Sequence, residues 1–373
     1  MTNANALLGG ILTADSQPDD LSDLCKLITD IGQKSSGARA GRGTMPETLD
    51  RQLWTDLCDT GLARLTSTPS LDAGPAELAL VLYTLARHAA AAPIAQTDLL
   101  AAWLISLIDH EQPQDAVLTV ACADSQLSNG WLRGVATDVP WASAADAIVI
   151  AARTADGLRI AVATHRELSI QYRHNLAGEP RDTVLFELPH ELFSDPLPGA
   201  ERELIRRGAW ARCVQAVGAL DAVAELTLQH TREREQFGKS LSQFQAVQQS
   251  LAAMAGLVEE ARATVNLAVS TTVEYGFDSP ATEFAVNCAK VTCARVVSPA
   301  NTVAHQLHGA IGTTLEHQLW RVTSRARSWT EEFGRPTASA VALGAYALAA
   351  PDPWDICIGL APDPQHHNGK GAL

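Results

Sequence analysis

The hydrophobic pattern of this 373-residue chain changes period twice, and this change constrains its fold more than any other feature. Apolar residues recur at helical spacing over residues 1–110, alternate in short runs over 115–195, and return to helical spacing from about 200 to 350. Side chains repeat every 3.6 residues on a helix and every 2 on a strand, so the three regions differ in structure. We therefore expect an α+β fold that is mostly α.

The first region has the pattern of amphipathic helices separated by breaks. Residues 53–65 and 77–92 carry apolar side chains three to four positions apart, and Pro69 and Pro93 interrupt them. We expect an N-terminal helical domain over residues 1–114.

The middle region has the pattern of short strands. Four β-rich runs are separated by Gly, Asn, Asp and Pro residues, which favour turns between strands. We expect a small antiparallel β-domain over residues 115–198. The four runs are 116–121, 147–151, 158–162 and 183–188.

The last region favours long helices joined by short turns. Residues 281–308 and 315–349 are long apolar-patterned segments, which is typical of a four-helix bundle. We expect this bundle over residues 199–350, followed by a mobile proline-rich tail over 351–373. One apolar stripe comprises Phe244, Val247, Leu251, Met254 and Val258.

Composition limits the partners and the compartment. The net charge of −14 disfavours nucleic acid and anionic membranes as general partners. The sequence has no basic-plus-apolar N-terminal signal and no apolar run of membrane length. The seven cysteines are odd in number and lack a CxxC pair, so free thiols in a reducing cytoplasm explain them best. They are Cys25, Cys58, Cys122, Cys213, Cys288, Cys293 and Cys357.

Two polar motifs in the helical third region carry the functional information. Residues 234–239 open on an arginine and turn at a glycine before a long helix, and residues 306–312 end a helix with two glycines. An arginine fork together with backbone that permits close approach suits a diphosphate. The motifs lie about 70 residues apart.

Together these motifs resemble the C-terminal half of the flavin-dependent acyl-CoA dehydrogenase family, and the helix–sheet–helix order extends the resemblance over residues 50–350. The resemblance implies an oxidoreductase acting on a CH–CH bond of an acyl-CoA, with FAD as cofactor and possible transfer of electrons to an electron-transferring flavoprotein. In this family the matching arginine and glutamine reach the FAD of a neighbouring subunit. The FAD-contacting positions that the resemblance implies here are Arg234, Gln236, Phe237, Gln306 and Gly309.

The family's reaction needs a carboxylate that takes the α-proton while flavin N5 takes a β-hydride. Counted along this sequence, one usual glutamate position falls on Phe333 and the other on Gly208. We therefore assign no catalytic residue. Glu331 and Glu332 are the nearest carboxylates, but each step along a helix rotates a side chain by about 100°.

Other positions also depart from the family pattern. Relatives place a Trp and a flavin-contacting Thr where this chain has Asp138 and Pro140, and many have a second glycine at Ala310. His305 and His308 lie three residues apart, but no carboxylate or thiol at ligand spacing accompanies them, so we predict no metal site.

The positions that serve a neighbour's FAD are kept, whereas those that would build this chain's own flavin site are mostly lost. This pattern resembles the incomplete subunit of α2β2 acyl-CoA dehydrogenases, which often act on bulky acyl-CoAs such as steroid side chains. We expect a homo- or hetero-oligomer that packs through helices in 240–350. Two alternatives remain open: a homotetramer that uses Glu331 or Glu332 as base, and a flavin-free scaffold or regulatory binding member of the family. The sequence does not identify the acyl chain.

Overall fold

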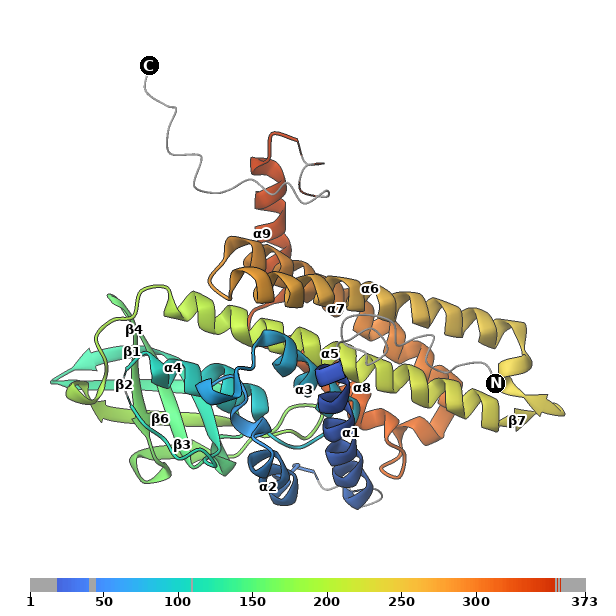
Figure 1. The fold of residues 1–373 in the computed structure, drawn as a ribbon, viewed down its shortest axis with the longest axis horizontal. Helices are drawn as coiled ribbons and strands as arrows, with labels where there is room; N and C mark the ends of the chain where they lie inside the picture. Colours follow the sequence, from blue (N-terminus) through green and yellow to red (C-terminus); the bar gives the residue numbers. More distant parts are fainter. Residues whose placement is uncertain (1–18, 40–44, 109, 353, 355, 357–373) are drawn as a thin grey trace.

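The computed structural model describes residues 19–39, 45–108, 110–352, 354 and 356. Helices come first, a sheet follows, and long helices complete the chain, so the expected α+β, mostly α fold is confirmed (Figure 1). The predicted tail lies largely outside the described residues. No helix in the described ranges is long and apolar enough to cross a membrane.

The N-terminal region forms short helices around a buried α3. The helix expected over 53–65 ends early because Gly61 takes a left-handed φ of 76°, and a short 3-10 turn follows. At the other end of this helix the Asp50 carboxylate caps it by accepting from the Leu53 N–H at 3.0 Å. The helices are α1 (Asp19–Arg39), α2 (Arg51–Asp59), α3 (Pro75–Arg87), the π-helix η5 (Ala95–Ala102) and α4 (Trp103–Ser106).

The middle region forms one six-stranded sheet in the order β4-β3-β1-β2-β6-β5. Neighbouring strands are antiparallel except β1 and β3, which pair in parallel, so the sheet is mixed rather than wholly antiparallel. All four predicted runs are strands, and β2 and β5 are additional. The strands are β1 (Leu118–Ser128), β2 (Trp131–Pro140), β3 (Ala147–Thr154), β4 (Gly157–Ala163), β5 (Leu168–Gln171) and β6 (Arg181–Pro189).

The last region is built around α5, which runs from the sheet to the opposite end of the molecule (Figure 1). The single helix expected over 315–349 is two helices, because Phe333 and Gly334 have φ of 53° and 101° and break the helix. In the predicted stripe Met254 and Val258 are buried. The helices are α5 (Ala200–Glu233), α6 (Gln245–Tyr275), α7 (Pro280–His308), α8 (Leu319–Trp329) and α9 (Pro336–Ala349).

Helices α3 and α5 approach each other closely at Gly218. The Tyr83 hydroxyl donates to the Asp221 carboxylate at 2.5 Å, and Asp221 also pairs with Arg262 on α6. A β-carbon on Gly218 would lie 2.3 Å from the Tyr83 carbonyl oxygen. Since backbone atoms cannot move aside as a flexible side chain can, glycine is required at this crossing.

We predict that Gly218→Ala destabilises the protein by about 1–3 kcal/mol or more, because α3 and α5 must separate to admit the methyl group. Thermal unfolding would show a midpoint lowered by about 1–4 °C or more. The matched control is Gly256→Ala in α6, where a β-carbon meets nothing within 4 Å. This control should unfold at the same temperature or slightly higher. Equal midpoints for the two variants would contradict the close approach.

Candidate functional site

The structure brings the two polar motifs to one end of the bundle, opposite the sheet (Figure 1). Arg234 ends α5, with its N–H donating to the His230 carbonyl at 2.8 Å, and the β7–β8 hairpin follows directly. The His230 ring stacks on that of His308, the last residue of α7, at 4.4 Å between centroids. Because Gly309 follows His308, segments about 70 residues apart in sequence become neighbours. We call this region the distal end.

The motif side chains at the distal end face solvent. The Arg234 guanidinium is exposed and makes no hydrogen bond or ion pair with a residue that the structure describes, and Phe237 is 92% exposed at the hairpin turn. The Gln236 side-chain amide donates to the Glu235 carbonyl at 2.8 Å. Gly309, with a φ of 66°, has open space where a β-carbon would point. These groups are therefore available to a ligand that this chain alone does not enclose.

Gln306 lies beside a groove of about 560 Å³ that runs along α7 and α8. This groove shares Leu176 and Arg327 with a cavity of similar volume near the sheet. On the groove wall the His305 ring nitrogen Nε2 lies 3.0 Å from the Thr323 hydroxyl. The groove thus leads from the distal end toward the sheet.

Histidines pack together at the distal end without forming a metal site. The rings of His308 and His317 meet edge to face at 4.8 Å, and the Nδ1 of His308 lies 2.8 Å from the Ala304 carbonyl oxygen. Burial lowers the pKa of His308 to about 4, so the ring is neutral at physiological pH. Within the described ranges no group of three or more His, Cys, Asp or Glu side chains has a metal-binding arrangement.

A cavity of about 550 Å³ lies where the sheet meets the turn between α8 and α9. Two carboxylates of the turn, Glu331 and Glu332, lie on its border together with Asp138 from the bulge in β2. The complete lining is Val120, Cys122, Thr137, Asp138, Val139, Pro140, Asn175, Leu176, Arg181, Arg327, Ser328, Glu331, Glu332 and Phe333.

Phe333 and Gly208, the two positions matching the family's glutamates, are in contact. A β-carbon on Gly208 would lie 2.1 Å from the Phe333 ring, so that ring occupies the space above the α5 backbone. A side chain at either position, one on α5 and the other on the α8–α9 turn, would therefore occupy the same space. In this chain an aromatic ring fills it, and neither position supplies a carboxylate.

Glu332 is held by arginines. Its Oε1 accepts from Arg181 Nε at 2.8 Å and Nη2 at 2.7 Å, and its Oε2 accepts from Arg212 Nε at 2.7 Å. The Lys290 ammonium donates to the backbone carbonyl of the same residue. Both oxygens of this carboxylate are therefore engaged in charge-assisted bonds within the protein, which opposes a role as general base. Glu331 is exposed at the cavity border.

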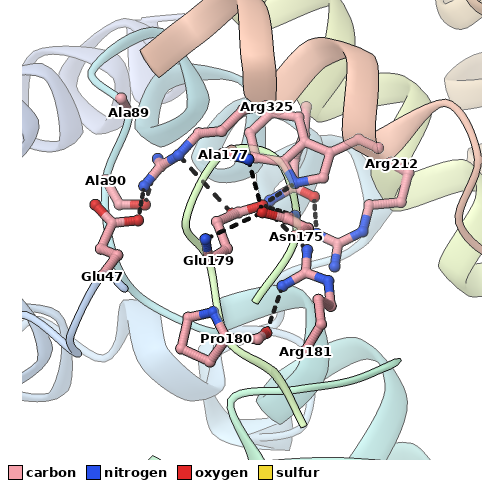
Figure 2. Close-up of polar contacts among 12 residues, drawn as sticks. Glu47, Ala89, Ala90, Asn175, Ala177, Glu179, Pro180, Arg181, Arg212 and Arg325 are labelled. Carbon is pink, nitrogen blue, oxygen red and sulfur yellow. Dashed lines mark hydrogen bonds and ion pairs between the residues drawn. The ribbon is translucent and has the colours of Figure 1, made fainter. Parts of the chain in front are cut away.

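Figure 2 shows that these arginines belong to a larger buried network centred on Glu179. Its carboxylate accepts from Trp329 Nε1 at 3.0 Å, Asn175 Nδ2 at 2.8 Å and Arg181 Nη2 at 3.1 Å. Burial alone would raise the pKa of Glu179, but Arg181, Arg325 and Arg212 together lower it to about 2. Glu179 is therefore a permanent anion within the core.

Arg325 extends the network to the N-terminal region. Its guanidinium pairs with Glu47 and donates to the Ala90 carbonyl at 2.9 Å (Figure 2). Of the charged residues in this network, the sequence pattern pointed only to Glu332. Arg181 and Arg212 lie 151 and 120 residues from Glu332, so no local pattern reveals their pairing.

The sheet wall of the cavity presents few groups that could bond a flavin ring. The nearest β1 hydroxyl, on Thr119, is buried and donates to the Pro140 carbonyl at 2.6 Å. The half-buried side chains of Val120 and Cys122 line the cavity, and burial raises the pKa of the Cys122 thiol to about 11. Beside them lie the Asp138 carboxylate, at the position where relatives carry a Trp, and Pro140, at the position of the lost hydroxyl donor.

We predict that Glu332→Gln destabilises the fold, whereas Glu331→Gln does not. Removing one partner of a buried ion pair costs roughly 3–5 kcal/mol, and the partial exposure of Glu332 reduces this to about 2 kcal/mol. Urea unfolding measures the free energy of unfolding of both variants. Glu331→Gln is the control because it makes the same chemical change at the neighbouring, exposed residue. Unchanged stability of Glu332→Gln would mean that its bonds to Arg181 and Arg212 are not maintained in solution.

Comparison with known proteins identifies relatives over most of the chain. Residues 201–337 match the family model "Acyl-CoA dehydrogenase, C-terminal domain". Acyl-CoA dehydrogenase FadE27 of Mycobacterium tuberculosis is 25% identical over 347 residues, covering 80% of this chain and 89% of that protein. Acyl-CoA dehydrogenase IpdE2 of Mycolicibacterium smegmatis is 25% identical over 325 residues, covering 84% of this chain and 94% of that one.

Two solved structures share the fold. A chain of the ChsE4-ChsE5 complex from Mycobacterium tuberculosis superposes with a TM-score of 0.79 at 22% identity, covering 90% of this chain and 99% of that chain. A chain of a variant of the Tcur3481-Tcur3483 steroid ACAD superposes with a TM-score of 0.74 at 20% identity, covering 92% of this chain and 99% of that chain.

Proposed function

Because this chain belongs to the acyl-CoA dehydrogenase family, we propose that it completes the FAD site of a partner chain in the α,β-dehydrogenation of an acyl-CoA thioester. One observation carries the proposal. The motif side chains at the distal end are exposed and available, whereas the place of the family's glutamates holds the Phe333 ring over Gly208.

The residues at the distal end fit the diphosphate of FAD. Arg234 offers a free guanidinium fork, Gln236 and Gln306 are exposed amides, and Gly309 lets a ligand approach the backbone. In this family FAD supplies the acceptor for the β-hydride. The Phe237 ring, almost fully exposed, offers a flat apolar surface beside Arg234.

The distance along α5 supports a role toward another chain's cofactor. Gly208, at the cavity near the sheet, and Arg234 are separated by 26 residues (234 − 208), or about 39 Å along a helix. One dinucleotide does not extend over that distance. The sheet wall of this chain also fits a flavin ring poorly, because Asp138 and Pro140 replace the donors that relatives carry. The cofactor served by Arg234 would then lie against a partner's sheet.

The surface of the bundle supports oligomerisation. Helix α9 has no buried residue, and its side chains are almost all small or apolar; Val341 is 73% and Leu348 90% exposed. Such a surface is typical of an interface. We propose that the partner is a second acyl-CoA dehydrogenase chain, one that carries a glutamate base. The fold is shared with a chain of a complex of two different chains, ChsE4-ChsE5. Similarity to a steroid ACAD favours a bulky acyl-CoA as substrate.

Flavin content tests the proposal. The chain would be purified alone and together with a homologous chain that carries the glutamate, and absorbance near 450 nm would be compared with protein concentration. We expect a colourless, inactive lone chain and one FAD per pair of unlike chains. A yellow lone chain that turns over acyl-CoA would support the homotetramer instead. A colourless pair would support a flavin-free scaffold.

We predict that Arg234→Ala in the assembled pair weakens FAD retention about ten- to a hundredfold, because a charge-assisted contact to a diphosphate is lost. Dilution followed by flavin fluorescence measures the dissociation. Arg232→Ala, an exposed arginine in the last turn of α5, is the matched control and should retain FAD normally. Equal retention by both variants would show that Arg234 does not contact the cofactor.

A further inference from the structure

A second, smaller cavity lies where the end of α1 meets the start of α8. Its volume is about 140 Å³, and it shares no lining residue with the cavity near the sheet or with the distal motifs. The cavity therefore lies between the N-terminal helices and the bundle. The lining residues are Arg39, Glu47, Thr48, Ala177, Trp320, Arg321 and Arg325.

Positive charge exceeds negative charge in this cavity. Three guanidinium groups surround one carboxylate, and both oxygens of Glu47 are already engaged. Its Oε1 accepts from Arg39 Nη1 at 2.8 Å, and its Oε2 pairs with Arg325. The Arg321 guanidinium makes a 3.5 Å contact from its Nη2 to the Arg39 carbonyl and lies 5.5 Å from the Trp320 ring centroid. No carboxylate of a described residue lies within 4 Å of it.

The nearest carboxylates outside the cavity lining already have other partners. Asp50 lies 3.8 Å from Arg39 Nε, but it caps α2 and accepts from the Ser35 hydroxyl at 2.6 Å. Glu179 lies 3.8 Å from Arg325 Nε and is bonded to Arg181. Neither carboxylate lines the cavity, so the excess charge of Arg321 is not neutralised there.

The arginines in the cavity disfavour one another. Burial, and then the charge of Arg325, lower the pKa of Arg39 to about 10, despite the opposing effect of Glu47 and Asp50. Burial also lowers the pKa of Arg321, as does Arg325. A bound anion would relieve this repulsion.

We propose that this cavity binds a single tetrahedral oxyanion, either inorganic phosphate or the terminal phosphate of a larger ligand. A volume of 140 Å³ is about five times the ~30 Å³ that one water molecule occupies in the liquid. It accommodates one phosphoryl group, but it is smaller than the ~300 Å³ lower limit of pockets that enclose a whole small-molecule ligand. Arg321 and Arg39 are the residues whose guanidinium groups would contact the oxyanion.

Titration of the full-length chain with inorganic phosphate at constant ionic strength tests the proposal. Calorimetry should give saturable binding, and the unfolding midpoint should rise with phosphate concentration, since a ligand of the folded state stabilises it. Arg321→Ala should weaken binding at least tenfold. Arg51→Ala, an exposed arginine at the start of α2, is the matched control and should bind phosphate as the wild type does. Arg39 and Arg325 are unsuitable because their ion pairs hold the fold.

Additional variants and ligands separate the possible outcomes. Arg321→Gln keeps a polar side chain, so it serves as a second test in case the alanine variant misfolds. It should also bind phosphate weakly. Arg234→Ala should bind phosphate normally, so failure of the cofactor proposal would leave this site unaffected. If CoA competes with inorganic phosphate but 3′-dephospho-CoA does not, the site binds the terminal phosphate of a larger ligand. If neither competes, the site binds free phosphate. Binding that does not saturate, or that Arg321→Ala and Arg51→Ala reduce equally, would overturn the proposal.

Discussion

The buried ionic network around Glu179 is the interaction on which the arrangement of the three regions depends. It joins the N-terminal helices through Glu47, the sheet through Arg181, and the bundle through Arg212 and Arg325 (Figure 2). Burying charges is costly unless each one has partners, and here most of the buried charges have them. The network also fixes geometry, because an apolar contact could slide whereas charge-assisted hydrogen bonds are directional and set how the parts are oriented.

The same network determines the chemistry of the cavity near the sheet. By holding Glu332 between Arg181 and Arg212, it anchors the turn in which Phe333 takes a left-handed φ of 53°. That conformation places the Phe333 ring over Gly208. Phe333, which by sequence is a simple replacement of the family's glutamate, is therefore part of a fixed structure. Restoring a carboxylate there would require the ring, the turn and the two arginines to rearrange together.

The two ends of α5 thus have opposite properties. Near the sheet, charges are paired and the usual position of the base is filled. At the distal end, Arg234, Gln306 and Gly309 are exposed, with no partner for the Arg234 guanidinium among the residues that the structure describes. Exposure of an arginine beside glycine backbone has no stabilising role within a single chain. The asymmetry is what a subunit that contributes to a neighbour's site would show.

The sequence alone determined what depends on local periodicity. It predicted the mostly α fold, the four strand runs, the long helices, and the two motifs with their order, since helix and strand repeats and glycine turns are encoded within a few residues. It predicted neither the parallel β1–β3 pair nor the division of 315–349 into α8 and α9.

Only the tertiary structure decided that Gly208 meets Phe333, that Glu332 lies between two arginines, and that Arg321 lines a cavity with excess positive charge. Each of these contacts joins residues far apart in the chain, such as the 151 residues between Arg181 and Glu332. Which distant residues meet is set by how the helices pack on one another and on the sheet, and a local pattern carries no record of that packing.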